Sequence, residues 1–281
     1  MSISTQVIYR LAPGRKSEVR PPWFDQLACL RSCLAAIESA RASGWTIATT
    51  AVVDGDVDER LSHELNAFDQ VEEIQLLGNS RAFRFALDLA TSRDFGVTYF
   101  AEDDYLWSGR SIVDTLAILR GFPEIDYASP YAHPFLQDPT LTEVRRHRSR
   151  SFSANGSGWT TTPRTTMTFA VRTDALRRDA HYWQLASYGR SPKDGYSFEA
   201  IIDGRWFRLI GNAAFRDPRR VLNARTVRLL TSCLSTRVGV GRRPLLVQPM
   251  DGLATHVHEP YLCGGEDWPA LSLSYAVPSP D

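Results

Sequence analysis

The stretch VTYFAEDDYLW at residues 97–107 decides the fold that this sequence predicts. It begins as an apolar run typical of a strand buried in a parallel sheet, and it leads directly into Glu102, Asp103 and Asp104. A helical pattern follows at residues 111–119. The acidic side chains therefore stand at the carboxyl end of a buried strand, which is where open α/β sheets bind their ligands.

The same alternation of strand and helix precedes this stretch. Apolar runs predict strands at residues 7–11, 45–53 and 71–77, and helical periodicity predicts helices at 24–42, at 57–68 and from Ser80, which we expect to cap the third helix. Strands that alternate with helices imply right-handed crossovers and a mainly parallel sheet. The predicted fold class is therefore α/β, with helices flanking the sheet.

The pattern loosens after Tyr127. Gly, Ser and Thr dominate residues 153–166, which predicts a loop. Beyond it, the sequence predicts strands at 167–172, 206–210 and 245–247 and helices at 173–180 and 196–203. No repeat or linker separates independent units, so we expect a single domain over residues 1–281.

Composition limits the classes of function. The chain has 281 residues with 43% apolar and 23% charged side chains, which suits a globular protein with a large core. Lys plus Arg (32) cancels Asp plus Glu (32), which argues against binding nucleic acid by bulk charge. No run of about 18 apolar residues predicts a transmembrane segment, and the N-terminus lacks the apolar centre of a signal peptide. We therefore expect a cytoplasmic protein.

The acidic triplet suggests a metal site. Alternate side chains at a strand end point the same way, so Glu102 and Asp104 are placed to bind one cation while Asp103 points back. Mg²⁺ and Mn²⁺ prefer such carboxylate oxygens and keep positions open for water and phosphates. The alternative is that the three acids are solvated loop residues.

The four segments VIYR, TTAVVDGD, GNSRAFRFALDLA and VTYFAEDDYLW, in this order, resemble the nucleotide-sugar half of the GT-A glycosyltransferases, particularly the family 2-like ones. In that family a DxD motif closes the fourth strand and holds the metal and the sugar-nucleotide diphosphate. The resemblance covers residues 5–130 and implies that Glu102 and Asp104 are the metal ligands, with Glu in place of the usual first Asp. Residues 1–130 would then form a nucleotide-sugar half, and residues 131–281 a C-terminal acceptor half.

The resemblance also implies which residues bind the donor. Asp54 would face the nucleoside, and Asn79 and Arg81 would approach the donor from the loop and helix before the DxD strand. Arg10, in the segment VIYR, and Asp103, in the middle of the motif, complete the implied donor site. The alternative for Asn79 is a turn residue that caps a helix.

A transferase that inverts the configuration at the anomeric carbon of the sugar needs a carboxylate to take a proton from the acceptor hydroxyl. Asp194 is our first candidate because its loop, SPKDGY, resembles the loop in which family 2-like enzymes carry the base as an ED pair. Here the pair is Lys193 and Asp194, which departs from the family pattern, so Glu199 is the second candidate. The alternative for Asp194 is a helix cap.

A late histidine completes the metal site in several GT-A enzymes, and here His256 and His258 alternate so that both project to one side of an extended segment. We prefer His258, and the alternative is that both are ordinary loop residues. Trp159, Trp183 and Trp206 are candidate sugar-stacking platforms or core residues. The basic run at residues 145–150 is a candidate phosphate clamp or a solvated face.

The sequence thus predicts a glycosyltransferase that uses Mn²⁺ or Mg²⁺ to move a sugar from a nucleotide-diphosphate sugar to a small-molecule or glycan acceptor. One alternative is a sugar-phosphate nucleotidyltransferase, although residues 13–16, PGRK, are a poor match to its Gly-rich loop. The other is a non-catalytic nucleotide- or carbohydrate-binding module on the same scaffold.

Overall fold

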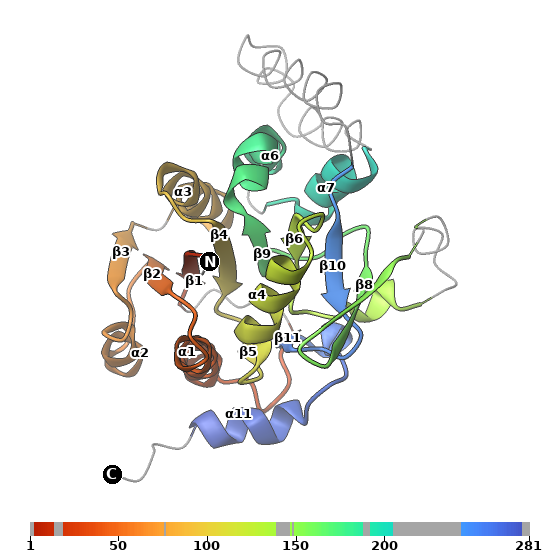
Figure 1. Ribbon diagram of the computed structural model, residues 1–281. Coiled ribbons are helices and arrows are strands. Elements are labelled where there is room, and N and C mark those ends of the chain that lie inside the picture. The colour runs from red at the N-terminus through yellow and green to blue at the C-terminus, as the bar shows by residue number, and fades with distance from the viewer. Residues whose placement is uncertain are drawn as a thin grey trace.

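A nine-stranded mixed sheet with helices on both faces forms the centre of the computed structural model (Figure 1). The strand order is β3-β2-β1-β4-β9-β6-β10-β8-β7, and a second sheet pairs β5 with β11. The structure describes residues 3–13, 19–75, 77–138, 147, 149–187, 192–204 and 243–276.

The first four strands of the large sheet are parallel. They are β1 (Thr5–Leu11), β2 (Ile47–Asp54), β3 (Gln70–Ile74) and β4 (Val97–Glu102), joined by α1 (Gln26–Ala42), α2 (Glu59–Leu65) and α3 (Asn79–Ser92). Their carboxyl ends meet at one edge, where Arg10 of β1 pairs in register with Glu102 of β4.

The later strands add an antiparallel part to the same sheet, while β6 and β10 run parallel to each other. The elements are β5 (Tyr105–Trp107), α4 (Ser111–Gly121), β6 (Tyr127–Ala128), η1 (Pro134–Leu136), β7 (Ser151–Ala154), β8 (Ser157–Thr161), β9 (Phe169–Arg172), α6 (Thr173–Ala186), α7 (Asp194–Phe198), the π turn η2 (Glu199–Asp203), β10 (Leu246–Pro249), β11 (Ala254–His256), η3 (Glu259–Tyr261) and α11 (Trp268–Ala276). The predicted α/β class is confirmed, and strands from both halves of the chain share one sheet.

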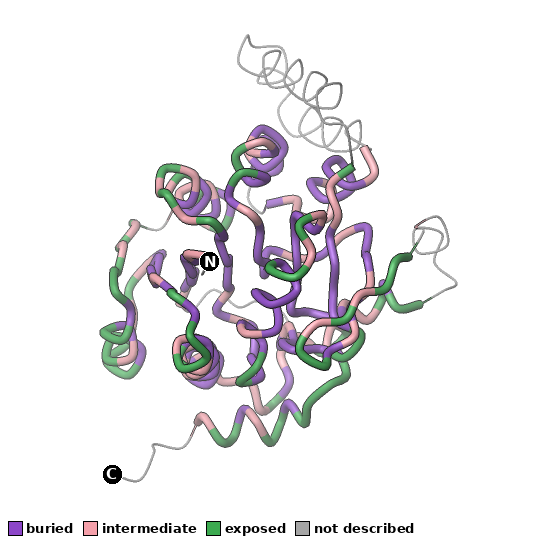
Figure 2. The backbone as a smooth tube through the Cα atoms, viewed as in Figure 1, coloured by how far each residue is buried: buried purple, intermediate pink, exposed green. Residues whose placement is uncertain are grey.

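Strand alternation divides the core into two layers, one on each face of the sheet. The central strands between these layers are buried (Figure 2). Tyr9 and Tyr99 face the layer that includes α1 and α4. Their neighbours Ile8 and Phe100 face the opposite layer, built with α3, α6 and α7. Because both layers are buried, one-residue shifts in β1 or β4 would place charged Arg10 and Glu102 against the α1 layer.

The last helix, α11, lies along α1 at the outside of that layer (Figure 1). Ser272 Oγ donates to the Trp23 carbonyl at 3.0 Å, and Arg31 Nη1 donates to the Tyr275 carbonyl at 3.0 Å. Among the described helices, none combines the length and apolar character needed to cross a bilayer.

Two local predictions are wrong. Helix α3 begins at Asn79 with Gly78 as its N-cap, so Ser80 lies inside the first turn and is not the cap. Residues 153–166 do not form a loop throughout, because β7 and β8 make an antiparallel hairpin there. Its turn is Asn155–Gly156, both with positive φ (49° and 78°), a pair that favours two-residue hairpin turns. The predicted strand at 206–210 lies outside the described residues.

Candidate functional site

Arg10 and Glu102 form the centre of the carboxyl edge. Arg10 Nη1 lies 3.3 Å from Glu102 Oε1, and Arg10 Nη2 donates to Asn79 Oδ1 at 2.5 Å. The guanidinium also lies over the ring of Phe83, 5.4 Å from its centroid. Because β1 and β4 are adjacent and α3 begins beside them, three of the predicted donor-site residues, Arg10, Asn79 and Glu102, come together.

Two residues that are distant along the chain, Arg20 and His256, contact the Asp104 carboxylate. Arg20 Nη2 lies 2.8 Å from Asp104 Oδ2, and His256 Nε2 lies 3.3 Å from the same oxygen. The antiparallel pairing of β5 with β11 places His256 opposite Tyr105, and the two rings stack with centroids 5.1 Å apart. The tertiary structure therefore brings a histidine to the acidic triplet.

That histidine is His256, and His258, the metal ligand preferred from the sequence, lies two residues further on. His258 follows it as the N-cap of η3, and its ring stacks on Tyr261 with centroids 5.0 Å apart. The two histidine rings are themselves 5.8 Å apart. The ring nitrogen Nε2 of His256 lies 3.3 Å from the Asp104 carboxylate, and the assignment of His258 as a metal ligand stays a prediction.

Asp103 points back into the protein, as the alternation of side chains predicts. It is buried, and its Oδ2 accepts hydrogen bonds from the Ala12 backbone N–H at 2.9 Å and from Gln26 Nε2. These contacts tie the acidic turn to the end of β1 and the start of α1. Its predicted contact with the donor stays a prediction.

Asp54 organises the loop that leads into α3. Its two carboxylate oxygens accept hydrogen bonds from the backbone N–H groups of Leu77 (2.6 Å) and Gly78 (2.8 Å), and the residue is 2% exposed. Asp54 thus holds the segment that presents Asn79 to Arg10. The contact of Asp54 with the nucleoside stays a prediction. Arg81 is exposed in the first turn of α3, and its approach to the donor also stays a prediction.

Electrostatics at the edge favour uptake of a proton or a cation. Burial raises the pKa of Glu102 to about 7 against the opposing charge of Arg10, and the charges of Asp104 and Asp194 raise it further. Burial alone would lower the pKa of His256, but the hydrogen bond and charge of Asp104, with the charge of Glu102, place it above its usual value. Negative charge therefore outweighs desolvation at His256.

Asp194 approaches the same place from α7. It is the first residue of that helix, and its Oδ1 accepts a hydrogen bond from the Gly195 N–H at 2.7 Å. Burial raises its pKa, while positive charges that include His256 and Arg164 lower it. Since its charge also acts on Glu102, Asp194 lies within electrostatic reach of the acidic edge.

Glu199 lies farther inside the protein. It is 2% exposed, and its Oε1 lies 3.6 Å from Arg164 Nη1. Of the two candidate bases, Asp194 is thus the one whose charge acts on Glu102 and on the histidine of the site. The assignment of either residue as the base stays a prediction.

The sequence around Arg20, Arg164 and His133 does not predict that these three residues lie at the site. Arg20 binds Asp104, and Arg164 faces Glu199 and influences both Asp194 and His133. Burial, together with the charge of Arg164, lowers the pKa of His133 to about 4. Each partner is distant along the chain, so spacing along the sequence does not reveal these contacts.

The donor chemistry of the site fits a divalent cation. Glu102 and Asp104 offer the oxygen ligands that Mg²⁺ and Mn²⁺ prefer, and His256 offers an imidazole nitrogen beside them. In the part of the chain that the structure describes, no group of three or more His, Cys, Asp and Glu side chains converges as a finished coordination shell. The carboxylates instead bind Arg10 and Arg20.

The proposed tryptophan platforms are wrong for the two residues that the structure describes. Trp159 and Trp183 are both 0% exposed and belong to the two core layers. Trp183 stacks on Phe169 with ring centroids 5.2 Å apart. Trp206 and half of the basic run, residues 145, 146 and 148, lie outside the described residues.

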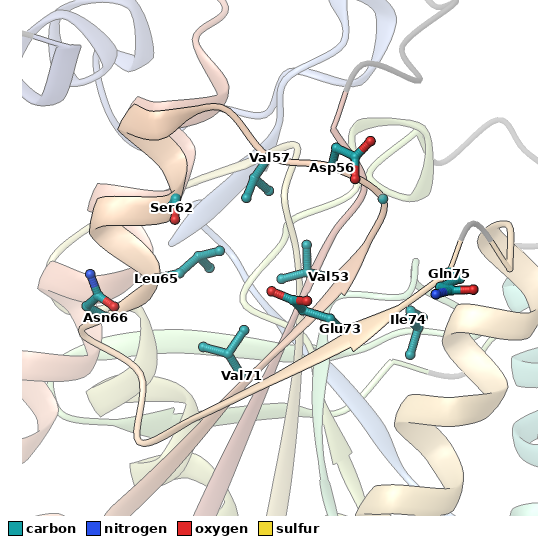
Figure 3. Close-up of a pocket in the computed structure, with 11 residues that line it drawn as sticks. Val53, Asp56, Val57, Ser62, Leu65, Asn66, Val71, Glu73, Ile74 and Gln75 are labelled. Atoms are coloured by element: carbon teal, nitrogen blue, oxygen red, sulfur yellow. The ribbon is translucent and has the colours of Figure 1, made fainter.

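A cavity of about 790 Å³ lies beside α2 (Figure 3). Val53 and Val71 of β2 and β3 and Leu65 of α2 line it, and the carboxylates of Asp56 and Glu73 stand around it. Val53 belongs to the core layer of α1, whereas Asp54 holds the loop into α3. Ile74, which packs against the opposite layer, also lines the cavity, so the cavity lies at the carboxyl ends of β2 and β3 and is not confined to one face of the sheet.

No protein-family model matches the sequence, and no curated protein matches it significantly. Solved structures with a similar fold include Mycobacterium tuberculosis glucosyl-3-phosphoglycerate synthase, at 11% identity and a TM-score of 0.42 over 74% of this chain and 67% of that one. Its complex with Mg²⁺ and uridine diphosphate matches at 10% identity and a TM-score of 0.40, over 62% of this chain and 57% of that one. S. aureus TarS 1-349 matches at 11% identity and a TM-score of 0.41, over 85% and 73%. The similarity to these structures is low in both sequence identity and TM-score.

Proposed function

We propose that this protein is a glycosyltransferase that moves a sugar from a nucleotide-diphosphate sugar to a small-molecule or glycan acceptor. One observation carries the proposal: at the carboxyl edge of the parallel strands, Glu102 lies 3.3 Å from Arg10, and Asp104 contacts Arg20 at 2.8 Å and His256 at 3.3 Å. Such an edge is the usual ligand site of an open α/β sheet. Carboxylates that share a site attract a cation. The repulsion between them also raises the pKa of a carboxylate, which suits it to accept a proton.

The acidic edge would hold the donor. Glu102, Asp104 and His256 would hold Mn²⁺ or Mg²⁺, which when bound supplies positive charge that stabilises the departing diphosphate. Arg10 and Asn79 keep Glu102 at the edge. Asp54 holds the loop that carries Asn79, so the donor would bind to residues whose positions are set by the sheet.

Asp194 would act as the base. As the acceptor oxygen bonds to the anomeric carbon, the bond from that carbon to the diphosphate oxygen breaks and the acceptor proton passes to the Asp194 carboxylate. Burial raises the pKa of Asp194, which makes it a stronger base than a solvent-exposed carboxylate. Positive Arg164 lies within electrostatic reach and opposes that rise.

The test measures nucleotide binding by calorimetry with Mn²⁺ present. We expect a nucleoside diphosphate to bind the wild-type protein, and the substitutions Glu102→Gln and Asp104→Asn to weaken binding by about tenfold or more each, equal to roughly 1.4 kcal/mol. Glu64→Gln is the matched control, because Glu64 also pairs with an arginine, Arg31, at 2.8 Å but away from the site. Equal affinity in the site variants and the wild type would contradict the proposal.

Turnover distinguishes the alternatives. Slow Mn²⁺-dependent hydrolysis of a nucleotide sugar supports a transferase, whereas binding without any hydrolysis or transfer supports a non-catalytic module. Release of pyrophosphate from a nucleoside triphosphate and a sugar phosphate supports a nucleotidyltransferase instead. The location in the cytoplasm and the single-domain organisation stay predictions.

A further inference from the structure

Asp104 already binds a positive charge from its own chain. Arg20 Nη2 lies 2.8 Å from Asp104 Oδ2, and the two side chains are only 10% and 18% exposed. Water and salt screen such a pair less than a surface pair. The guanidinium thus binds the carboxylate that the proposed function assigns to a divalent cation.

Arg20 is held in this place by contacts other than Asp104. Its Nη1 donates to the Val257 carbonyl at 2.5 Å, and its guanidinium lies 5.1 Å from the centroid of the Phe24 ring. The Val257 N–H in turn donates to the Asp104 carbonyl at 2.9 Å. Arg20, the acidic turn and the segment after β11 therefore form one connected set of contacts.

Arg10 binds the carboxylate of Glu102 less closely than Arg20 binds that of Asp104. Arg10 Nη1 lies 3.3 Å from Glu102 Oε1, while its shorter contact, at 2.5 Å, is to Asn79 Oδ1. Arg20 has its short ionic contact with Asp104 itself. Of the two arginines, Arg20 is thus the one whose position conflicts with a cation at the acidic triplet.

We propose that Arg20 is a resident counter-ion that occupies the cation position at Asp104, so that a divalent ion binds only when Arg20 gives up this contact. The inference rests on the proposed function, because that function assigns Asp104 to the metal. A guanidinium and a divalent ion repel each other, and that repulsion is strong in a site shielded from water. Arg20 therefore lowers the affinity of the protein for a free metal ion and sets how readily the site takes one up.

The test measures binding of Mn²⁺ alone, from the loss of the electron paramagnetic resonance signal of the free ion. We expect Arg20→Gln to bind Mn²⁺ more tightly than the wild type by at least about fivefold, the lower end of ordinary coupling between two ligands. Arg20→Lys keeps the charge and is expected to stay near the wild type. Arg31→Gln is the control, since Arg31 loses a 2.8 Å contact to Glu64 away from the site.

A second variant covers the case in which Arg20→Gln does not fold. Phe24→Leu keeps the charge of Arg20 but removes the ring beneath it, so we expect a smaller gain in Mn²⁺ affinity, between wild type and Arg20→Gln. Cooperative thermal unfolding checks each variant. Equal or weaker Mn²⁺ binding in a folded Arg20→Gln protein overturns the inference, and so does an unchanged affinity in Phe24→Leu when that is the variant that folds.

These measurements separate the inference from the proposed function. No nucleotide is present, so failure to bind a nucleoside diphosphate leaves a gain of Mn²⁺ affinity in Arg20→Gln intact. Conversely, if neither the wild type nor Arg20→Gln binds millimolar Mn²⁺, the inference is overturned while sugar transfer without a metal still stands to be tested.

Discussion

Arg10 and Glu102 face each other across the parallel ladder of β1 and β4, with Arg10 Nη1 3.3 Å from Glu102 Oε1. The side chains are 9% and 20% exposed, so both charges are largely removed from water. A shielded carboxylate that loses its partner keeps the cost of desolvation without the compensating attraction. This ion pair therefore links the stability of the sheet edge to the charge of the candidate site.

Arg10→Gln should destabilise the protein. We expect the free energy of unfolding to fall by about 2–4 kcal/mol at pH 8, because Glu102 stays shielded from water and loses the attraction of Arg10. At pH 5 the loss should be smaller, since Glu102 then carries a proton. Urea unfolding at the two pH values measures the difference, and Arg31→Gln, whose pair with Glu64 is more exposed, should cost less than about 1 kcal/mol. An equal loss in both variants would contradict the role of shielding.

Glu102 should make stability depend on pH. Its pKa is raised from 4.5 to about 7, so the folded state binds this proton more tightly than the unfolded state does. Its contribution to the free energy of unfolding is thus fully present below pH 4.5 and is lost as pH rises through about 7.

Glu102→Gln removes that proton-binding group. Its stability relative to the wild type should therefore increase as pH rises from 4.5 to 7, measured by urea unfolding across this range. A stability difference that stays constant over the range, or that decreases as pH rises, would show that the pKa of Glu102 is not raised.

Asp194→Asn should separate chemistry from binding. The amide keeps an oxygen that can accept from the Gly195 N–H but cannot take up the acceptor proton. We expect the turnover rate to fall by about 10²–10⁴-fold while the affinity for the nucleoside diphosphate changes little. Glu199→Gln, at the second candidate, should retain most of its turnover, and the reverse pattern would assign the base to Glu199.

Gly252→Ala should disturb the segment that carries His256. A Cβ at Gly252 would lie 2.3 Å from Cys263 Sγ and 2.6 Å from the Gly264 carbonyl oxygen, so the backbone must move. We expect a loss of about 1–3 kcal/mol in the free energy of unfolding.

Gly109→Ala is the matched control for this substitution. A Cβ at Gly109 meets nothing within 4 Å, so stability should change by less than about 1 kcal/mol in either direction. Thermal unfolding of both variants provides the measurement. Equal stability of Gly252→Ala and the wild type would show that the contact with Cys263 and Gly264 relaxes at no cost.

The first half of the fold could be predicted because its signals are local. An apolar strand followed at once by Glu102, Asp103 and Asp104 places acids at a strand end whatever the rest of the chain does. The hairpin of β7 and β8 was missed because its composition suggested a loop, although Asn155–Gly156 is itself a turn signal.

The type of residue alone does not tell whether a tryptophan is a core residue or a sugar-stacking platform. Large aromatic side chains serve both cores and sugar platforms, and the choice depends on which elements pack around them. Trp159 and Trp183 are buried because β8 and α6 place them inside the two core layers. Nothing in the neighbouring sequence distinguishes this from an exposed position.

By itself the sequence determined the first four strands and the helices between them, the α/β class and the acidic triplet at the end of β4, because these depend on residues that are close along the chain. Only the tertiary structure decided which groups meet that triplet. The pairing of β5 with β11 brings His256 to Asp104, and the same turn receives Arg20 from near the N-terminus. Contacts between residues so far apart in sequence exist only after the sheet and its edges have formed, so no local pattern encodes them.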